Sequence, residues 1–89
     1  MHTVRERKKL ITRVRKIRGQ VEAIEKALAA EKSCFEVLQT AAAARGALSG
    51  LVGEIVEDHV RFHVLDSRSS PEQQEAADEL IAVVRAYVR

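Results

Sequence analysis

Apolar side chains recur at alternating intervals of four and three residues along two long stretches of the chain. In the first stretch the repeating positions are Leu10, Val14, Ile17, Val21, Ile24 and Leu28. In the second stretch they are Cys34, Leu38, Ala41, Arg45, Leu48, Val52, Ile55 and His59. A third, shorter stretch places on one side of a helix the residues Ala77, Leu80, Ile81, Val84 and Val88. Spacing of this kind aligns side chains along one face of an α-helix. The pattern therefore predicts an all-α fold with three helices in each protomer.

A capping box precedes each stretch and marks where each helix should begin. In this motif a Ser or Thr side chain caps the helix, and a Glu or Gln stands three residues later. The three pairs are Thr3 with Glu6, Ser33 with Glu36, and Ser70 with Gln73. Pro71 also suits the first helical position, where a missing N–H costs nothing. We expect one domain over residues 1–89, with helices at about 4–30, 34–65 and 71–88.

The predicted lengths of the first two helices imply that one copy of the chain cannot bury its apolar residues alone. At a rise of about 1.5 Å per residue they would be about 40 and 47 Å long. A compact chain of 89 residues has a radius of gyration of only about 12 Å. The shorter third helix cannot cover both apolar stripes, so we expect another copy to cover them. The sequence therefore predicts a homo-oligomer built around a helical bundle.

Composition narrows the class of protein. Hydrophobic residues make up 46% of the chain, charged residues 31% and aromatic residues 3%. This balance argues against a disordered chain and against a β-sandwich or barrel. No apolar run approaches the ~20 residues that span a bilayer, so we expect no membrane segment. The single cysteine excludes a disulfide framework and favours a reducing cytoplasm. No acid–base pair, nucleophile triad or phosphate loop stands out, so we expect no enzyme.

Basic residues are concentrated at the N-terminal end. Residues 1–20 carry eight Lys or Arg side chains and one acidic one, whereas the remaining residues carry seven basic and twelve acidic side chains. The first predicted helix has a basic stripe away from its apolar side, formed by Lys9, Arg13 and Lys16 with Arg5 and Arg15 beside it. The stripe fits a polyanionic partner, and an ordinary solvated helix face would carry similar charges. Because no helix-turn-helix or zinc finger accompanies it, phosphate contacts and DNA shape would dominate recognition of DNA.

The side chains able to bind a soft or borderline metal ion are His2, Cys34, His59 and His63. His59 and His63 lie one helical turn apart, which lets two imidazoles bind one ion. Cys34 lies on the same side of the second predicted helix, about 37 Å from His59. One chain cannot bring these donors together, but two antiparallel copies of this helix can, with two equivalent sites per dimer. Taken singly, Cys34 could be a small apolar residue and the two histidines an exposed pair.

The position of Cys34 favours a role as ligand, because it directly follows the predicted cap Ser33. The N–H groups of a first helical turn and the helix dipole favour the thiolate that binds metal. His2 precedes the first helix and could fold over the same site. Three imidazoles and one thiolate suit borderline cations, and Zn(II) fits these four donors.

Five parts of the sequence are shared with a known family. They are residues 13–24, Cys34 with 37–39, residues 43–47, residues 57–59 with His63, and residues 83–87. In these parts, and over essentially the whole chain, the sequence resembles the CsoR/RcnR family of bacterial metal- and stress-sensing repressors. The resemblance implies an antiparallel bundle dimer, a dimer of dimers, and operator DNA that is released when an effector binds. The residues that it implies for DNA contact are Arg5, Lys9, Arg13, Arg15 and Lys16.

Within this family the ligand set separates the branches. Copper sensors use a Cys-His-Cys pattern and persulfide sensors need two cysteines, whereas this chain has one cysteine, with His63 where the second cysteine of the copper pattern would be. The set His2, Cys34, His59 and His63 resembles that of the RcnR/DmeR branch, whose effectors are Ni(II) and Co(II). The resemblance thus implies a repressor that binds operator DNA without metal and releases it when metal binds, so that metal efflux genes are expressed.

Two other functions remain open. The body of the sequence also resembles the formaldehyde-sensing FrmR branch of the family, in which Cys34 would be a nucleophile and His59 would orient it. That branch pairs the cysteine with an N-terminal proline amine, where this chain has His2. The other function is that of a protein that does not bind DNA, such as a coiled-coil adaptor or a metal chaperone.

Overall fold

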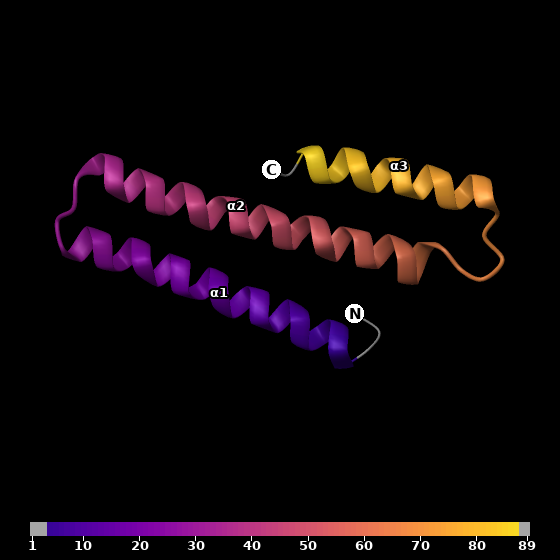
Figure 1. Cartoon of the computed structure of the whole chain (residues 1–89), viewed down its shortest axis with the longest axis horizontal. Coiled ribbons are helices and arrows are strands. Elements are labelled where there is room, and N and C mark those ends of the chain that lie inside the picture. The colour runs from indigo at the N-terminus through magenta and orange to yellow at the C-terminus, as the bar shows by residue number, and fades with distance from the viewer. Residues whose placement is uncertain (1–3, 88–89) are drawn as a thin grey trace.

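The computed structural model describes residues 4–87 and folds them into three antiparallel α-helices. The outer helices α1 (Val4–Ala29) and α3 (Pro71–Tyr87) lie on opposite sides of the central helix α2 (Cys34–His59), as Figure 1 shows. A short π-helical turn, η1 (Val60–Val64), continues α2 into the linker to α3. No strand occurs within residues 4–87. The prediction of an all-α protomer with three helices is confirmed.

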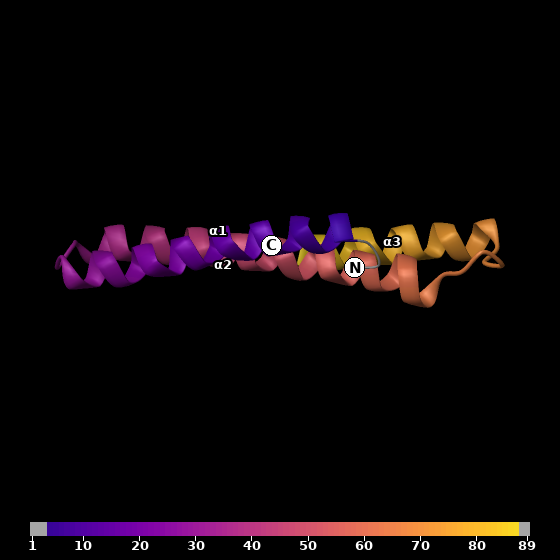
Figure 2. The same cartoon turned by 90° about the horizontal axis from the view of Figure 1, so that it is seen from below.

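The three helices form a flat layer that is one helix thick. In the edge-on view of Figure 2 they lie in a single band, and the principal extents of the chain are 56 × 27 × 11 Å. The radius of gyration of 17.1 Å is well above the ~12 Å of a compact chain of this length. A helix in such a layer buries only the sides that face its neighbours. Two sides of α2 are therefore covered, and one side of each outer helix.

Side-chain caps fix the starts of α2 and α3 where the sequence predicts them. The Glu36 N–H donates to Ser33 Oγ at 3.1 Å. At α3 the box is reciprocal, because the Gln73 N–H donates to Ser70 Oγ at 3.1 Å and the Ser70 N–H donates to Gln73 Oε1 at 2.7 Å. The cap predicted for the first helix, Thr3, lies outside the described residues.

A pair of hydrogen bonds of the Schellman type ends α1. The Lys32 N–H donates to the Ala27 carbonyl at 3.0 Å, and the Glu31 N–H donates to the Leu28 carbonyl at 3.1 Å. This geometry places Glu31 in the left-handed region, with φ of 55°. Glycine is the usual residue there, because a Cβ is crowded at positive φ. The chain therefore reverses between α1 and α2 at a small conformational cost.

The last turn of the second helix differs from the α-helix expected to residue 65. The Leu65 N–H donates to the Val60 carbonyl at 2.9 Å, five residues back, so this turn is π-helical. Residues five apart in an α-helix point about 140° away from each other, whereas a turn closed over five residues brings them near the same side. Leu65 can therefore pack beside Val60 against Ala77 and Ile81 of α3. Packing against α3 accounts for the wider turn.

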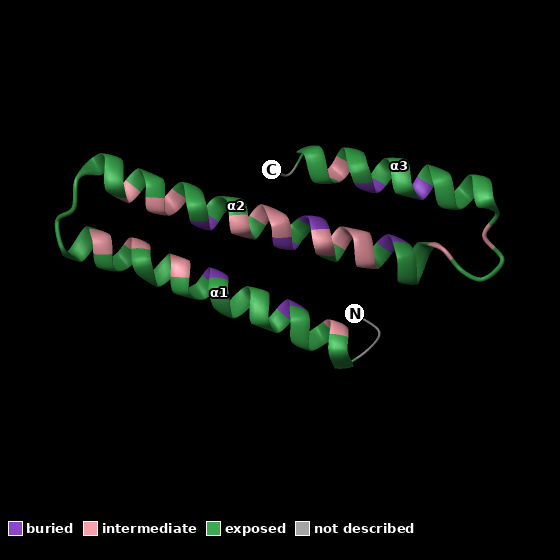
Figure 3. Cartoon of the chain, viewed as in Figure 1, coloured by how far each residue is buried: buried purple, intermediate pink, exposed green. Residues whose placement is uncertain are grey.

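Two small apolar clusters hold the layer together. Leu10 and Ile17 of α1 pack against Leu51 of α2, and Val60 packs against Ala77 and Ile81 of α3. In Figure 3 the buried residues are separate purple patches on the sides where the helices face one another. Within residues 4–87 no large side chain is less than 2% exposed. A single chain thus has a very thin core.

One broad surface of the layer is apolar, and we call it the apolar face. It consists of residues that are 37–64% exposed, namely Val14, Val21, Leu28, Leu38, Leu48, Val52 and Ile55. At about 100° per residue, α2 directs its members of this set between the sides that meet α1 and α3. The apolar stripe predicted for the second helix is therefore largely exposed in one chain, and the stripe of the first helix is divided between the α2 contact and this face.

The opposite surface, the polar face, carries ion pairs that connect α3 to the end of α2. Arg85 Nη2 lies 2.9 Å from Glu57 Oε2, and Arg61 Nη2 lies 2.8 Å from Asp78 Oδ1. The hydrogen bond from Arg85 lowers the pKa of Glu57 below its ordinary value of 4.5, although burial acts in the other direction. Because these side chains are partly exposed, the pairs orient α3 more than they stabilise it.

Replacing Glu31 with glycine should stabilise the protein. Removing the Cβ relieves the left-handed conformation at the end of α1, and we expect the free energy of unfolding to rise by about 0.5–1 kcal/mol. Urea unfolding at one fixed protein concentration measures this difference. Glu31→Ala, which keeps a Cβ, is the matched control. Equal stability of the glycine and alanine variants would contradict the explanation.

Candidate functional site

The predicted metal ligands within the described residues lie at opposite ends of α2. Cys34 is the first residue of this 26-residue helix and His59 is the last, so the two are about 37 Å apart along the axis. Within residues 4–87 no group of three or more His, Cys, Asp or Glu side chains could hold a metal ion. His2 lies outside the described residues. Of the three predicted ligands within residues 4–87, one chain brings two together.

Those two ligands are His59 and His63, whose ring centroids are 5.3 Å apart with an angle of 31° between the ring planes. His63 belongs to the π-helical turn η1, and both residues are exposed. An imidazole nitrogen binds a metal ion at about 2.0–2.1 Å, so rings at this separation can bind one ion after small rotations. The pair can therefore supply two donors from one chain.

Cys34 is exposed and occupies the first turn of α2, directly after the cap Ser33. His59 follows Cys34 by 25 residues, and each residue turns the helix by about 100°. The two side chains therefore point within about 20° of each other around the helix axis. Both residues thus share the side of α2 that carries Leu38, Leu48 and Val52 of the apolar face. The thiol and the imidazole pair mark the two ends of one exposed stripe.

Two of the predicted DNA-contact residues already have an acidic partner. Arg13 donates to a carboxylate oxygen of Glu54 on α2, and Lys9 Nζ lies 3.5 Å from the other oxygen. The Glu54 side chain is only 13% exposed. Arg13 crosses α2 above Gly50, where an added Cβ would lie 3.4 Å from its guanidinium. Arg5, Arg15 and Lys16 are exposed.

Sequence reasoning missed Glu54 as a partner of this stripe, because 41 residues separate it from Arg13. Together with Arg85 of α3 these residues line a hollow of about 440 Å³ on the polar face. All three helices contribute to it. Arg85 thus joins the basic residues of α1 at one surface, and no local pattern in the sequence could have found this.

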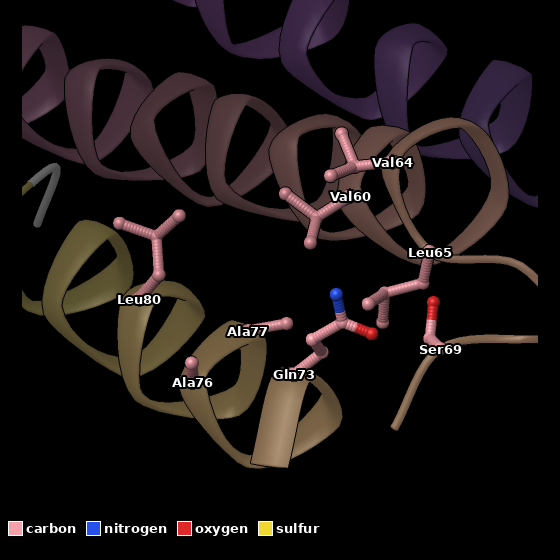
Figure 4. A pocket seen from close by; sticks show the side chains of 8 residues that line it. All are labelled: Val60, Val64, Leu65, Ser69, Gln73, Ala76, Ala77 and Leu80. Atoms are coloured by element: carbon pink, nitrogen blue, oxygen red, sulfur yellow. The ribbon is translucent and has the colours of Figure 1, made fainter. Parts of the chain in front are cut away.

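A second, apolar pocket of about 360 Å³ lies where η1, the linker and α3 meet. Figure 4 shows its lining residues, with Val60 and Val64 of η1 on one side, Ala77 and Leu80 of α3 on the other, and Gln73 near Ser69 of the linker. The Gln73 oxygen already accepts the capping hydrogen bond from Ser70. This pocket adjoins the residue after His63 but contributes no further metal ligand.

Within the described part of the chain, no helix combines the length and apolarity needed to cross a bilayer.

Known proteins resemble this chain over nearly its full length. A family model described as "Metal-sensitive transcriptional repressor" matches residues 6–86. The chain is 36% identical over 88 residues to the transcriptional repressor RcnR of Salmonella paratyphi B, with coverage of 99% of this chain and 98% of RcnR. It is 45% identical over 89 residues to an uncharacterized Serratia marcescens protein from the bioA 5′ region, with coverage of 99% and 98%.

A solved structure is also similar. It is a variant of the formaldehyde-responsive regulator FrmR from Salmonella enterica serovar Typhimurium, in which a histidine replaces a glutamate. The TM-score is 0.72 and the sequence identity 42%, with coverage of 98% of this chain and 99% of the other. The fold, the family model and the relatives agree with one another. The chain therefore belongs to the metal-sensitive transcriptional repressor family, the CsoR/RcnR family, whose members repress transcription and are not enzymes.

Proposed function

We propose that this protein is a repressor that binds operator DNA without metal and releases it on binding Ni(II) or Co(II), so that metal efflux genes are expressed. One observation carries the proposal. Cys34 and His59 lie at opposite ends of one exposed apolar stripe on α2, and His63 lies 5.3 Å from His59. The donors are of the right kind for these ions, but one chain holds them too far apart.

A second copy of the chain would cover the apolar face and would also bring the separated donors together. Covering the apolar face removes its side chains from water, and each Å² of apolar surface buried contributes about 25 cal/mol. If two α2 helices pair antiparallel around a two-fold axis near residues 46–49, Cys34 of each chain faces His59 and His63 of the other. The dimer then has two equivalent sites, each shared between chains. A further pairing of dimers would give the dimer of dimers that the family resemblance implies.

The proposed ligands are His2, Cys34, His59 and His63. The first turn of α1 lies beside the last turns of α2 in Figure 1, and His2 precedes this turn in the sequence. Three imidazoles and one thiolate suit Ni(II) and Co(II), which also accept more than four ligands, and Zn(II) fits the same donors. The response to one metal rather than another would depend on which coordination geometry shifts α1, and not on affinity alone.

DNA binding is proposed for the basic residues of α1. They are Arg5, Lys9, Arg13, Arg15 and Lys16, which would contact backbone phosphates. His2 is the proposed link, because its movement toward the shared site also moves the start of α1 and its basic side chains. Bound metal then weakens the binding free energy for DNA by about 1–3 kcal/mol, and bound DNA weakens that for metal by the same amount.

The similarity to a formaldehyde-responsive regulator supports a second candidate. Its chemistry would use the exposed Cys34. The Cys34 thiol adds to the formaldehyde carbon, an amine from the N-terminus displaces the resulting hydroxyl as water, and a methylene bridge joins sulfur to nitrogen. The chain gains one carbon atom, about 12 Da, and no oxidant is needed.

A cobalt titration tests the ligand set. We expect absorption from the thiolate-to-cobalt transition in the wild type and none in Cys34→Ala, and the intensity of the d–d bands distinguishes four from six ligands. His63→Ala should weaken cobalt binding and keep the thiolate absorption. Identical spectra from the wild type and Cys34→Ala would exclude Cys34 as a ligand.

Release from DNA tests the effector. Fluorescence anisotropy with DNA from upstream of the gene should show binding by the metal-free protein that weakens steeply with salt. Ni(II) or Co(II) should lower this affinity by about 5- to 150-fold. The same DNA-binding measurement is repeated with formaldehyde in place of metal, and the intact mass of the protein is measured on the same sample. Release with formaldehyde, a gain of about 12 Da and no response to metal would replace the metal proposal by the second candidate.

A further inference from the structure

The hollow on the polar face gathers basic side chains from two helices around acidic residues of the third. Lys9 and Arg13 come from α1 and Arg85 from α3, while Glu54 and Glu57 belong to α2. Each of the three basic residues lies within 4 Å of a carboxylate oxygen. The hollow has a volume of about 440 Å³ and is open to solvent.

We propose that this hollow docks the backbone phosphates of double-stranded DNA, and that Glu54 holds the place of a phosphate when DNA is absent. The inference rests on the proposed DNA-binding function and deepens it. It adds Arg85 of α3 to the DNA surface, and it makes Glu54 an internal competitor that weakens DNA binding. Carboxylate and phosphate oxygens are equivalent acceptors for a guanidinium or ammonium group, so they compete for the same donors.

Exposure determines which group an approaching phosphate meets. The Lys9 side chain is 77% exposed and that of Arg13 is 42% exposed, whereas Glu54 is 13% exposed. The carboxylate therefore lies beneath its two cations. A phosphate can reach the outer sides of Lys9 and Arg13 without meeting Glu54 directly. Leaving Glu54 costs free energy, because a carboxylate with little exposure then loses its partners.

Arg85 repeats this arrangement from the other side of the hollow. Its side chain is 42% exposed and is held at 2.9 Å by Glu57. Arg85 reaches Glu57 from α3, whereas Lys9 and Arg13 reach Glu54 from α1, and Figure 1 shows α1 and α3 on opposite sides of α2. Phosphate docking would thus span the width of the layer.

The hollow also remains accessible in the proposed dimer. The contacts of Lys9 and Arg13 with Glu54 lie on the polar face, opposite Val52 and Ile55 of the apolar face. Pairing across the apolar face leaves the hollow open to solvent. Dimers joined in this way present two such surfaces to DNA.

The test is a salt titration of binding to a random-sequence duplex, followed by fluorescence anisotropy with metal-free protein. Glu54→Gln releases Lys9 and Arg13, so it should bind DNA several-fold more tightly than the wild type. The slope of log K against log salt should steepen by about 0.9 for each additional phosphate that the variant neutralises. Glu22→Gln removes the same charge from an exposed position of α1 outside the hollow, and it should leave the slope unchanged.

Two further variants separate competition from a change in net charge or folding. Adding Arg13→Gln to Glu54→Gln should abolish most of the increase in affinity, because Arg13 is the main donor released. Arg85→Gln should flatten the salt slope and Arg85→Lys should restore it, with thermal unfolding recorded for each variant.

The outcomes distinguish this inference from the proposed function. If the wild type binds DNA but Glu54→Gln binds with the same affinity and slope, the inference is wrong and the repressor function stands. The same holds if Glu22→Gln increases the affinity equally, since net charge alone would then explain the effect. If no variant binds DNA in a salt-dependent manner, both are wrong.

Discussion

The constraint on which the rest of the structure depends is that a single layer of three helices leaves one side of α2 exposed. α1 covers one side of α2 and α3 covers another, so within residues 4–87 the stripe containing Leu38, Leu48 and Val52 stays 42–64% exposed. With a core limited to two small clusters, the stabilisation available within one chain is small. The exposed stripe offers further apolar surface for burial, and a second copy of the same stripe is the complement that we propose.

This constraint connects the two proposed activities. Cys34 and His59 terminate the exposed stripe, so the proposed pairing that buries apolar side chains would also assemble the proposed metal site. Lys9 and Arg13 of α1 and Arg85 of α3 lie on the polar face, where the proposed dimerisation would not cover them. α1 contributes to both surfaces: its apolar residues border the dimer contact, and Lys9 and Arg13 lie on the other side. A displacement of α1 would therefore affect both surfaces at once.

Much of the fold follows from local sequence, because its causes are local. The capping boxes at Ser33 and Ser70 depend on residues three apart, and the helical period is visible within a few turns. The π-helical turn could not be predicted, because it depends on how Leu65 packs against α3, which is a tertiary contact. The partner of Arg13 is 41 residues away, so nothing near the basic stripe indicated that Glu54 neutralises it. The helical period predicts that Cys34 and His59 share one side of α2, but their distance along the helix means that the proposed site needs a second chain.

The most direct test of the central claim mixes two inactive variants. Cys34→Ala chains and chains carrying both His59→Ala and His63→Ala each lack one half of the proposed shared site. After unfolding and refolding together, half of the dimers are mixed and each has one complete site, so about a quarter of the wild-type thiolate-to-cobalt absorption should return. A chain with all three substitutions, mixed with Cys34→Ala, should restore none. If the complementary mixture also stays without absorption while the wild type absorbs, Cys34 and the histidine pair do not meet across two antiparallel α2 helices.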